Sequence, residues 1–209
     1  MNRIWIVTAV SALTVAGAAA GLATAAVNGE HVDNLRFGAV KEIVLDNTRG
    51  EVEIASAGNG TVVAVKRTTV TLFAKATQTA YVSDGVLHLG SSCNHTLCAV
   101  EYRITAPAGV LLRVTNREAN VTVKGSPGDV RVVNTREGEI TLDLARAPRA
   151  ISARTASGDI GVTVPRGTYA FSAYAPEGGR TITGVTLSAT ANHAIRTSTG
   201  KGDVRLSGR

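Results

Sequence analysis

The sequence is short of aromatic side chains, methionine and clustered charge. Aromatic residues make up 4% of the 209 positions, methionine occurs once, and the 22 lysines and arginines are scattered rather than run together. A nucleic-acid-binding protein needs a basic stripe, aromatic stacking positions or a recognition helix, so no nucleic acid is expected as a partner. The formal charge of +6 suits an anionic cell-wall polymer or an anionic lipid surface instead.

A recognisable metal or nucleophile motif is also missing. The four histidines stand in unrelated contexts, at His31, His88, His95 and His193. The acidic residues recur at turns in repeated register, as structural residues do, whereas a catalytic site is a single irregular constellation. We therefore expect no cofactor and no enzymatic activity. A glycan-processing β-helix enzyme that works through paired carboxylates is the less favoured alternative.

The residues that are frequent are those of β-strands and tight turns. Valine, threonine, alanine and glycine favour strands punctuated by glycine turns over amphipathic helices. From residue 37 onward apolar side chains alternate with polar ones, as at Ile43 and Leu45 or at Val52 and Ile54. We expect one all-β domain over residues 37–209, and the short polar stretch 28–36 before it is interpreted as a linker.

The N-terminal segment, residues 1–27, is uncharged after Met1-Asn2-Arg3. As a hydrophobic helix it would be roughly 36 Å long, enough to cross a hydrocarbon core of about 30 Å. Its small residues at 18–20 and 23–25 also match cleavage patterns of a signal peptide. The segment is therefore predicted to be a signal peptide or a membrane anchor, with a helix buried in the domain as a third option. The first two place the domain outside the cytoplasm, membrane-anchored or secreted.

Two interleaved series recur about every 20 residues in the second half of the chain. In the first, an apolar residue follows a glycine–acid turn, at Val121, Ile140, Ile160, Ile182 and Val204. In the second, a strand ends in Asn or Thr next to Arg, at 114–117, 133–136, 153–156, 173–176 and 195–198. Such a period predicts a β-solenoid with two short strands and two turns per coil. An antiparallel β-sandwich or meander is the alternative.

Stacking of equivalent positions predicts a ladder of charged residues along one edge. Its members are Asp129, Glu139, Asp159, Asp203, Arg117, Arg136, Arg154 and Arg196. The ladder is interpreted either as a binding face for a charged polymer, with a calcium site in the acidic row as a variant, or as turn residues whose charges offset one another on a solvated edge.

Cys93 and Cys98 bracket a loop of four residues. In an exported chain two cysteines so close together are expected to form a disulfide, worth on the order of 2 kcal/mol for so small a loop. A metal site formed by Cys93, His95 and Cys98 is the alternative, although its spacing matches no common zinc pattern.

The repeats resemble a known family. The motifs that carry the resemblance are Gly128-Asp129-Val130, Gly138-Glu139-Ile140, Ser157-Gly158-Asp159-Ile160, the link from Val164 to Tyr169 and Thr199-Gly200-Lys201-Gly202-Asp203-Val204. Together with the cysteine strand pair and the N-terminal hydrophobic segment, they are similar to the bacterial putative-adhesin family of β-strand-repeat proteins, a domain of unknown function. The resemblance covers residues 37–209, and Ala119-Asn120 and Gly178-Gly179-Arg180 depart from the motif.

This resemblance implies a role at the cell surface or envelope and supplies no catalytic residues. We therefore expect a non-enzymatic envelope protein that binds a surface ligand, its partner being an anionic cell-wall polymer or an envelope protein. The membrane would be a partner through residues 1–27 if these are not cleaved. An accessory protein of envelope-stress signalling or an envelope scaffold is the alternative, and the last strand, near Val204-Arg205-Leu206, is expected to be open for pairing with another chain.

Overall fold

A computed structural model describes residues 23–26, 29–56, 58, 60–71 and 75–209 of the chain. These residues form strands and turns, and no helix occurs among them, which confirms the all-β fold class. None of the described residues belongs to a helix long and apolar enough to cross a lipid bilayer. Most of the N-terminal segment lies outside the described residues, but its residues 23–26 form strand β1 (Ala23–Ala26) instead of a helix.

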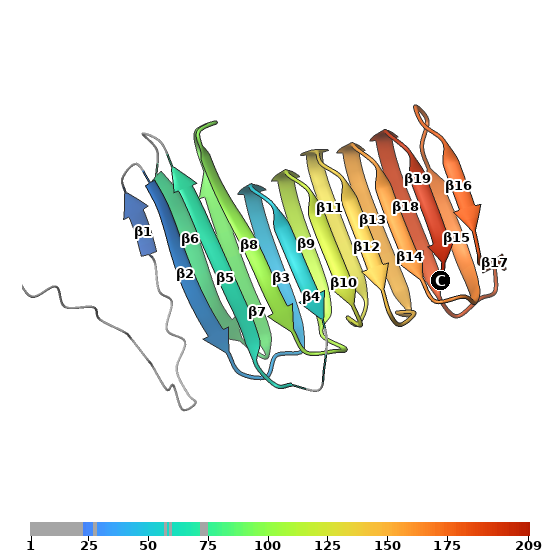
Figure 1. The fold of residues 1–209 in the computed structure, drawn as a ribbon, viewed down its shortest axis with the longest axis horizontal. Coiled ribbons are helices and arrows are strands. Elements are labelled where there is room, and N and C mark those ends of the chain that lie inside the picture. The colour runs from blue at the N-terminus through green and yellow to red at the C-terminus, as the bar shows by residue number, and fades with distance from the viewer. Residues whose placement is uncertain (1–22, 27–28, 57, 59, 72–74) are drawn as a thin grey trace, which may run out of the picture.

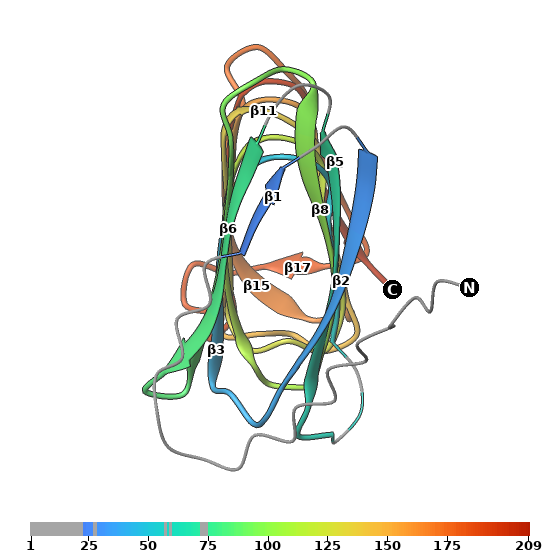
Figure 2. The ribbon, with the colours of Figure 1, turned by 90° about the vertical axis from the view of Figure 1, so that its left-hand side faces the viewer.

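The strands build two mixed sheets that face each other as the two walls of an elongated molecule (Figures 1 and 2). Sheet I has ten strands in the order β1, β6 (Lys75–Ser83), β7 (Val86–Cys93), β3 (Glu42–Arg49), β9 (Leu111–Glu118), β11 (Val130–Glu137), β13 (Ala150–Ser157), β18 (Ala194–Lys201), β15 (Thr168–Tyr174) and β17 (Thr186–Leu187). Sheet II has nine, in the order β16 (Arg180–Thr183), β19 (Val204–Gly208), β14 (Ile160–Val164), β12 (Ile140–Leu144), β10 (Val121–Gly125), β4 (Val52–Ser56), β8 (Cys98–Ala106), β5 (Val63–Thr71) and β2 (Gly29–Phe37).

From β9 onward the chain passes back and forth between the sheets. A strand of sheet I and the strand of sheet II that follows it form one unit, and equivalent strands of stacked units pair in parallel. Val121 lies beside Ile140, and Ile140 lies beside Ile160. Every second side chain of these strands points between the sheets, and Val121, Ile140 and Ile160 are fully buried there. The alternating pattern of the sequence therefore encodes the core that joins the two sheets.

Several pairs of N-terminal strands are antiparallel instead, whereas β3 and β4 pair in parallel with their neighbours. β6 and β7 form a hairpin whose two-residue turn is Asp84-Gly85, with φ angles of 53° and 78°. Such left-handed turns match the twist of paired strands, and Asp-Gly is a favoured sequence for them. β5 pairs with β8 on one side and with β2 on the other, again antiparallel.

Strand β2 replaces the linker that the sequence predicts at residues 28–36. It forms the outer edge of sheet II, where most of its side chains are exposed, so its polar sequence carries little of the strand pattern. Asp33 of β2 accepts hydrogen bonds from Nε and Nη2 of Arg67, at 3.1 and 2.8 Å. Because Arg67 is buried, this pair fixes the edge strand to the fold.

The units do not stack in the order of the sequence at the C-terminal end. Ile160 pairs with Val204, and Ile182 lies beyond it, opposite Leu206. The unit β18–β19 is thus inserted between β13–β14 and β15–β16 (Figure 1), and the expected place of Ile182 directly after Ile160 is wrong. The expectation of an open last strand is wrong as well, because β19 has a partner on each side.

Burial explains this order. Val204 and Leu206 of β19 are each 1% exposed, whereas all four residues of β16 are exposed. Placing the apolar unit inside and the polar strand at the end removes more apolar surface from water than the sequential order would. It also leaves a short polar strand at the edge, which discourages pairing with other chains.

Candidate functional site

A row of buried polar side chains runs across sheet I. Each member lies near the end of a strand, just before the turn that leads into sheet II. Its members lie side by side in the register of the parallel strands, and all are at most 5% exposed. We call it the Asn/Thr row: Asn47, Asn116, Asn134, Thr155 and Thr199.

Each member of the Asn/Thr row donates to backbone carbonyls of the turns. The Nδ2 atom of Asn134 donates to the carbonyl oxygens of Ala119 and Gly138, at 3.1 and 3.2 Å. Thr155 Oγ1 lies 3.2 Å from the same Gly138 oxygen and 2.9 Å from that of Ser157. A buried carbonyl without a partner costs about 1–3 kcal/mol, so the row satisfies groups that the turns would otherwise leave unpaired.

The turns that follow this row form what we call the turn rim, which consists of Gly50, Ala119, Gly138, Gly158 and Gly202. At Gly158 φ is +131°, and an added Cβ would lie 2.4 Å from the carbonyl oxygen of Gly138 in the neighbouring unit. Glycine is required there both for the backbone angle and for the close approach of the stacked turns. The Ser157-Gly158-Asp159 motif is therefore a stacking device.

The acids of the turn rim are engaged by backbone amides. Oδ1 of Asp159 accepts from the N–H of Asp203, and Oδ1 of Asp203 accepts from that of Gly179, both at 2.8 Å. Glu139 lies in the same row and accepts from Thr141 Oγ1 at 3.0 Å. The bonds of Asp159 and Asp203 link neighbouring units, so these two carboxylates help to hold the stack together.

Asp129 does not belong to this row. It lies in the turn that leads from sheet II back to sheet I, and its Oδ1 accepts from the N–H of Ala150 at 2.9 Å. No group of three or more His, Cys, Asp or Glu residues that could hold a metal ion occurs in the part of the chain that the structure describes.

The four predicted arginines are also divided. Arg117 and Arg136 lie at the turn rim, whereas Arg154 and Arg196 are exposed on the outer side of sheet I. Two further arginines lie on this side, Arg113 and Arg131, which the sequence analysis did not select. They occupy opposite positions of the neighbouring strands β9 and β11. The sequence does carry a signal for Arg113 and Arg131, because each lies between two buried residues of its strand and therefore faces outward.

We call this surface the basic face. It consists of Arg113 of β9, Arg131 of β11, Arg154 of β13 and Arg196 of β18, which are exposed on four adjacent strands. Arg113, Arg131 and Arg196 share one level of the sheet, at which β13 has Ser152, and Arg154 lies two residues further along its strand. Arg113 forms an ion pair with Glu42 at one end of the row. Because neighbouring strands lie about 4.8 Å apart, the backbone positions of the four arginines extend over about 14 Å across the sheet.

Three arginines gather around one carboxylate at the end of this face. Glu118 pairs with Arg49 and Arg136, and Arg117 Nε lies 4.0 Å from it. The hydrogen bond from Arg49 is the main reason why the pKa of Glu118 lies below its usual value, with Arg136 adding to it. These residues line an open hollow of about 390 Å³, which we call the rim hollow, together with Thr48 and residues 92–96.

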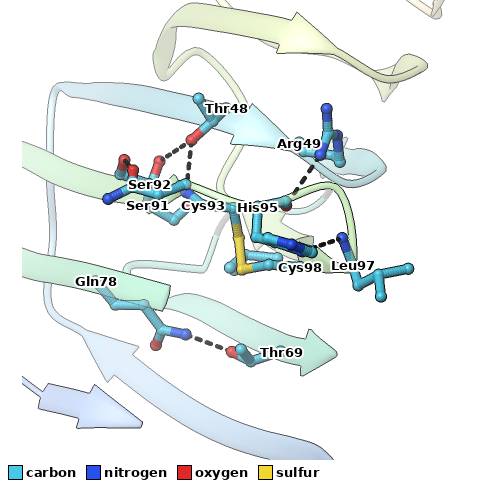
Figure 3. Close-up of a disulfide and its surroundings, with 12 residues drawn as sticks. Thr48, Arg49, Thr69, Gln78, Ser91, Ser92, Cys93, His95, Leu97 and Cys98 are labelled. Atoms are coloured by element: carbon cyan, nitrogen blue, oxygen red, sulfur yellow. Dashed lines mark hydrogen bonds between the residues drawn. A yellow bond between two sulfur atoms is a disulfide. The ribbon is translucent and has the colours of Figure 1, made fainter. Parts of the chain in front are cut away.

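The disulfide loop, drawn in Figure 3, lines one side of the rim hollow with residues 92–96. Cys93 and Cys98 are bonded, which confirms the expected pairing and removes the alternative of a metal site at these sulfurs. The carbonyl oxygen of His95, inside the loop, accepts from Arg49 Nη1 at 3.0 Å. Thr48 Oγ1 accepts from the N–H of Cys93 at 3.0 Å, which holds the start of the loop against β3.

Solved structures with a similar fold come from bacteria. A putative cell adhesion protein from Clostridium sporogenes is 10% identical, with a TM-score of 0.61, and the match covers 87% of this chain and 100% of that one. A putative adhesin from Bacteroides fragilis is 15% identical, with a TM-score of 0.34, and the match covers 86% and 97%. No protein-family model and no curated protein sequence matches the chain. The resemblance to bacterial putative adhesins that the repeats indicate is thus confirmed at the level of the fold, by the Clostridium sporogenes structure.

Proposed function

We propose that the protein is a non-enzymatic, extracytoplasmic binding module of the cell envelope, and that its basic face binds an anionic polymer. The observation that carries this proposal is the group of exposed arginines on four adjacent strands, Arg113, Arg131, Arg154 and Arg196. Several guanidinium groups on one face suit a polymer that bears a phosphate or carboxylate on each repeat unit.

We further propose that the two sheets under the basic face form a β-solenoid. Its support is the parallel pairing of equivalent strands from unit to unit, with the Asn/Thr row and the turn rim repeating in register. Each unit buries its apolar face by stacking on its neighbours. The spacing of the arginines is therefore fixed by the backbone and not by flexible loops.

A non-enzymatic role is supported by the use that the acids find. Asp129, Asp159 and Asp203 accept backbone N–H groups, so they serve the stack and not a reacting group. The similarity in fold to a protein described as a putative cell adhesion protein agrees with surface binding. The disulfide supports an oxidising compartment outside the cytoplasm. The mass of the mature N-terminus, measured by mass spectrometry, tells whether residues 1–27 anchor the protein in the membrane or are cleaved so that it is released.

Binding to isolated cell wall and to a purified anionic wall polymer tests the proposal. The test variant replaces the four arginines of the basic face by glutamine. The control variant makes the same change in charge on the outer side of sheet II, at Lys66, Arg103, Lys124 and Arg205, which are all exposed. We expect the wild type and the control to be retained at about 0.1 M salt and the test variant to be lost.

Equal losses in both variants would mean that net charge and not the basic face drives retention. Absence of wild-type retention on any anionic polymer would overturn the proposal. Specific capture of one envelope protein in its place would favour the accessory role in envelope signalling.

A further inference from the structure

We propose that the rim hollow is a binding site for a single oxyanion group, a phosphate, sulfate or carboxylate. The inference rests on the proposed function and deepens it, because the hollow lies at the end of the strands that carry the basic face. Arg117 follows Arg113 on the same side of β9, and Arg136 belongs to β11, which carries Arg131. The hollow would hold one charged group of a polymer that lies along the face.

Charge is the first argument. Arg49, Arg117 and Arg136 surround Glu118, which leaves an excess of two positive charges around a hollow of about 390 Å³. Glu118 stays ionised, so it balances one guanidinium only. Like-charged guanidinium groups held together favour an anion between them, and an oxyanion matches the planar fork of arginine.

The donors that remain unused are the second argument. A guanidinium carries five N–H donors. Arg49 is committed to Glu118 and to the carbonyl of His95. Arg136 uses only Nη1 toward Glu118. The guanidinium of Arg117 donates no hydrogen bond within the described part of the chain, and its nearest carboxylate oxygen is 4.0 Å away. Arg117 and Arg136 are thus the two arginines of the hollow with the most donors left to offer a ligand.

Glu118 is a positioning residue in this site. It lies between Arg49 of β3 and Arg136 of β11 and holds both guanidinium groups at the mouth of the hollow. The disulfide loop completes the wall, with Ser92, Asn94 and Thr96 as neutral polar groups next to the arginines. Hydroxyl and amide groups can donate to an oxyanion without adding charge, which favours a specific site over a diffuse basic patch.

Titration of the full-length protein with inorganic phosphate tests the site, followed by the NMR signals of the arginine Nε–H groups, with chloride kept constant. The test variant combines Arg117→Gln with Arg136→Gln. The control combines Lys66→Gln with Arg103→Gln, which removes the same charge from the outer side of sheet II, at exposed residues that do not line the hollow. We expect phosphate to bind the wild type and the control with affinities that agree within about twofold, and the test variant about tenfold more weakly or not at all. Thermal unfolding verifies that each variant is folded.

Equal weakening of phosphate binding in both variants, or none in either, would overturn the oxyanion site. The same variants are then compared with a wall polymer that carries phosphate groups, to separate a free ion from a polymer group. If the polymer still binds and the affinity for phosphate does not depend on Arg117 and Arg136, the oxyanion site is refuted but the proposed function stands. Phosphate bound in the hollow without any polymer binding supports the site and removes the proposed function. Reduction of the Cys93–Cys98 bond is expected to weaken phosphate binding, because it releases one wall.

Discussion

Asp203 donates its backbone N–H to Oδ1 of Asp159 at 2.8 Å, although 44 residues separate them in the chain. The turn before the last strand therefore stacks directly on the turn before β14, and the intervening segment that contains β15 and β16 is displaced to the end of the molecule. The unit β18–β19 therefore lies inside the array, and the unit β15–β16, which precedes it in the chain, lies at the end.

This order predicts opposite results for two deletions. Removing residues 190–209 deletes β18 and β19, so that β16 loses its partner β19 and β15 keeps only its two-residue pairing with β17. We expect hydrogen exchange in residues 168–174 to become fast. Removing residues 168–189 leaves β18–β19 free to pair with β13–β14, and we expect that variant to unfold cooperatively. Continued protection of residues 168–174 in the first deletion would contradict the stacking order.

Gly158→Ala should destabilise the stack. The substitution forces a side chain into φ +131° and places its Cβ 2.4 Å from the carbonyl oxygen of Gly138. Residues held in such strained conformations cost of the order of 1–3 kcal/mol. Denaturant unfolding measures the loss. Gly161→Ala, three residues later, is the matched control, because nothing lies within 4 Å of its added Cβ. Equal effects at the two sites would refute the stacking role of Gly158.

Asn134→Ala should cost about 1–2 kcal/mol of unfolding free energy. The amide serves two carbonyls, and other members of the Asn/Thr row share part of that task, so the loss stays below the full penalty for two unpaired groups. Asn134→Thr should recover part of the stability, since Thr155 and Thr199 fill the same position in other units. Thr135→Ala, at the exposed neighbouring residue, is the control and should change stability by less than about 0.5 kcal/mol. An alanine variant as stable as this control would contradict the proposed bonding.

The sequence predicts the strands better than it predicts their neighbours. Alternation and glycine–acid turns locate the starts of β12, β14 and β19 at Ile140, Ile160 and Val204. A period of about 20 residues is shared by every unit, so it carries no information on which unit lies next to which. The order was decided by burial, since β16 offers no apolar face and β19 does.

The same limit applies to the candidate site. Gly-Asp pairs occur both in turns from sheet I to sheet II and in turns from sheet II back to sheet I. The sequence spacing therefore placed Asp129 in one row with Asp159, although the two residues lie in turns at opposite ends of the strands. Arg117 and Arg136 were predicted from their place beside Asn and Thr. Arg49 was missed, because it reaches Glu118 across 69 residues of sequence, and only the parallel pairing of β3 with β9 brings the two together.

Glu118→Gln should lower stability in a pH-dependent manner. The pKa of Glu118 is lowered in the folded protein, mainly by the hydrogen bond from Arg49, so its ionised form stabilises the fold above the usual carboxyl pKa of 4.5. As the pH falls through the lower, folded-state pKa, this contribution is lost. The difference in unfolding free energy between wild type and variant should thus be constant near neutral pH and shrink below about pH 4.5. Urea unfolding across this pH range measures the difference. Glu137→Gln, at an exposed residue, is the control for the effect of removing a surface carboxylate. A difference that grows on acidification would show that the three arginines do not stabilise the charged form of Glu118.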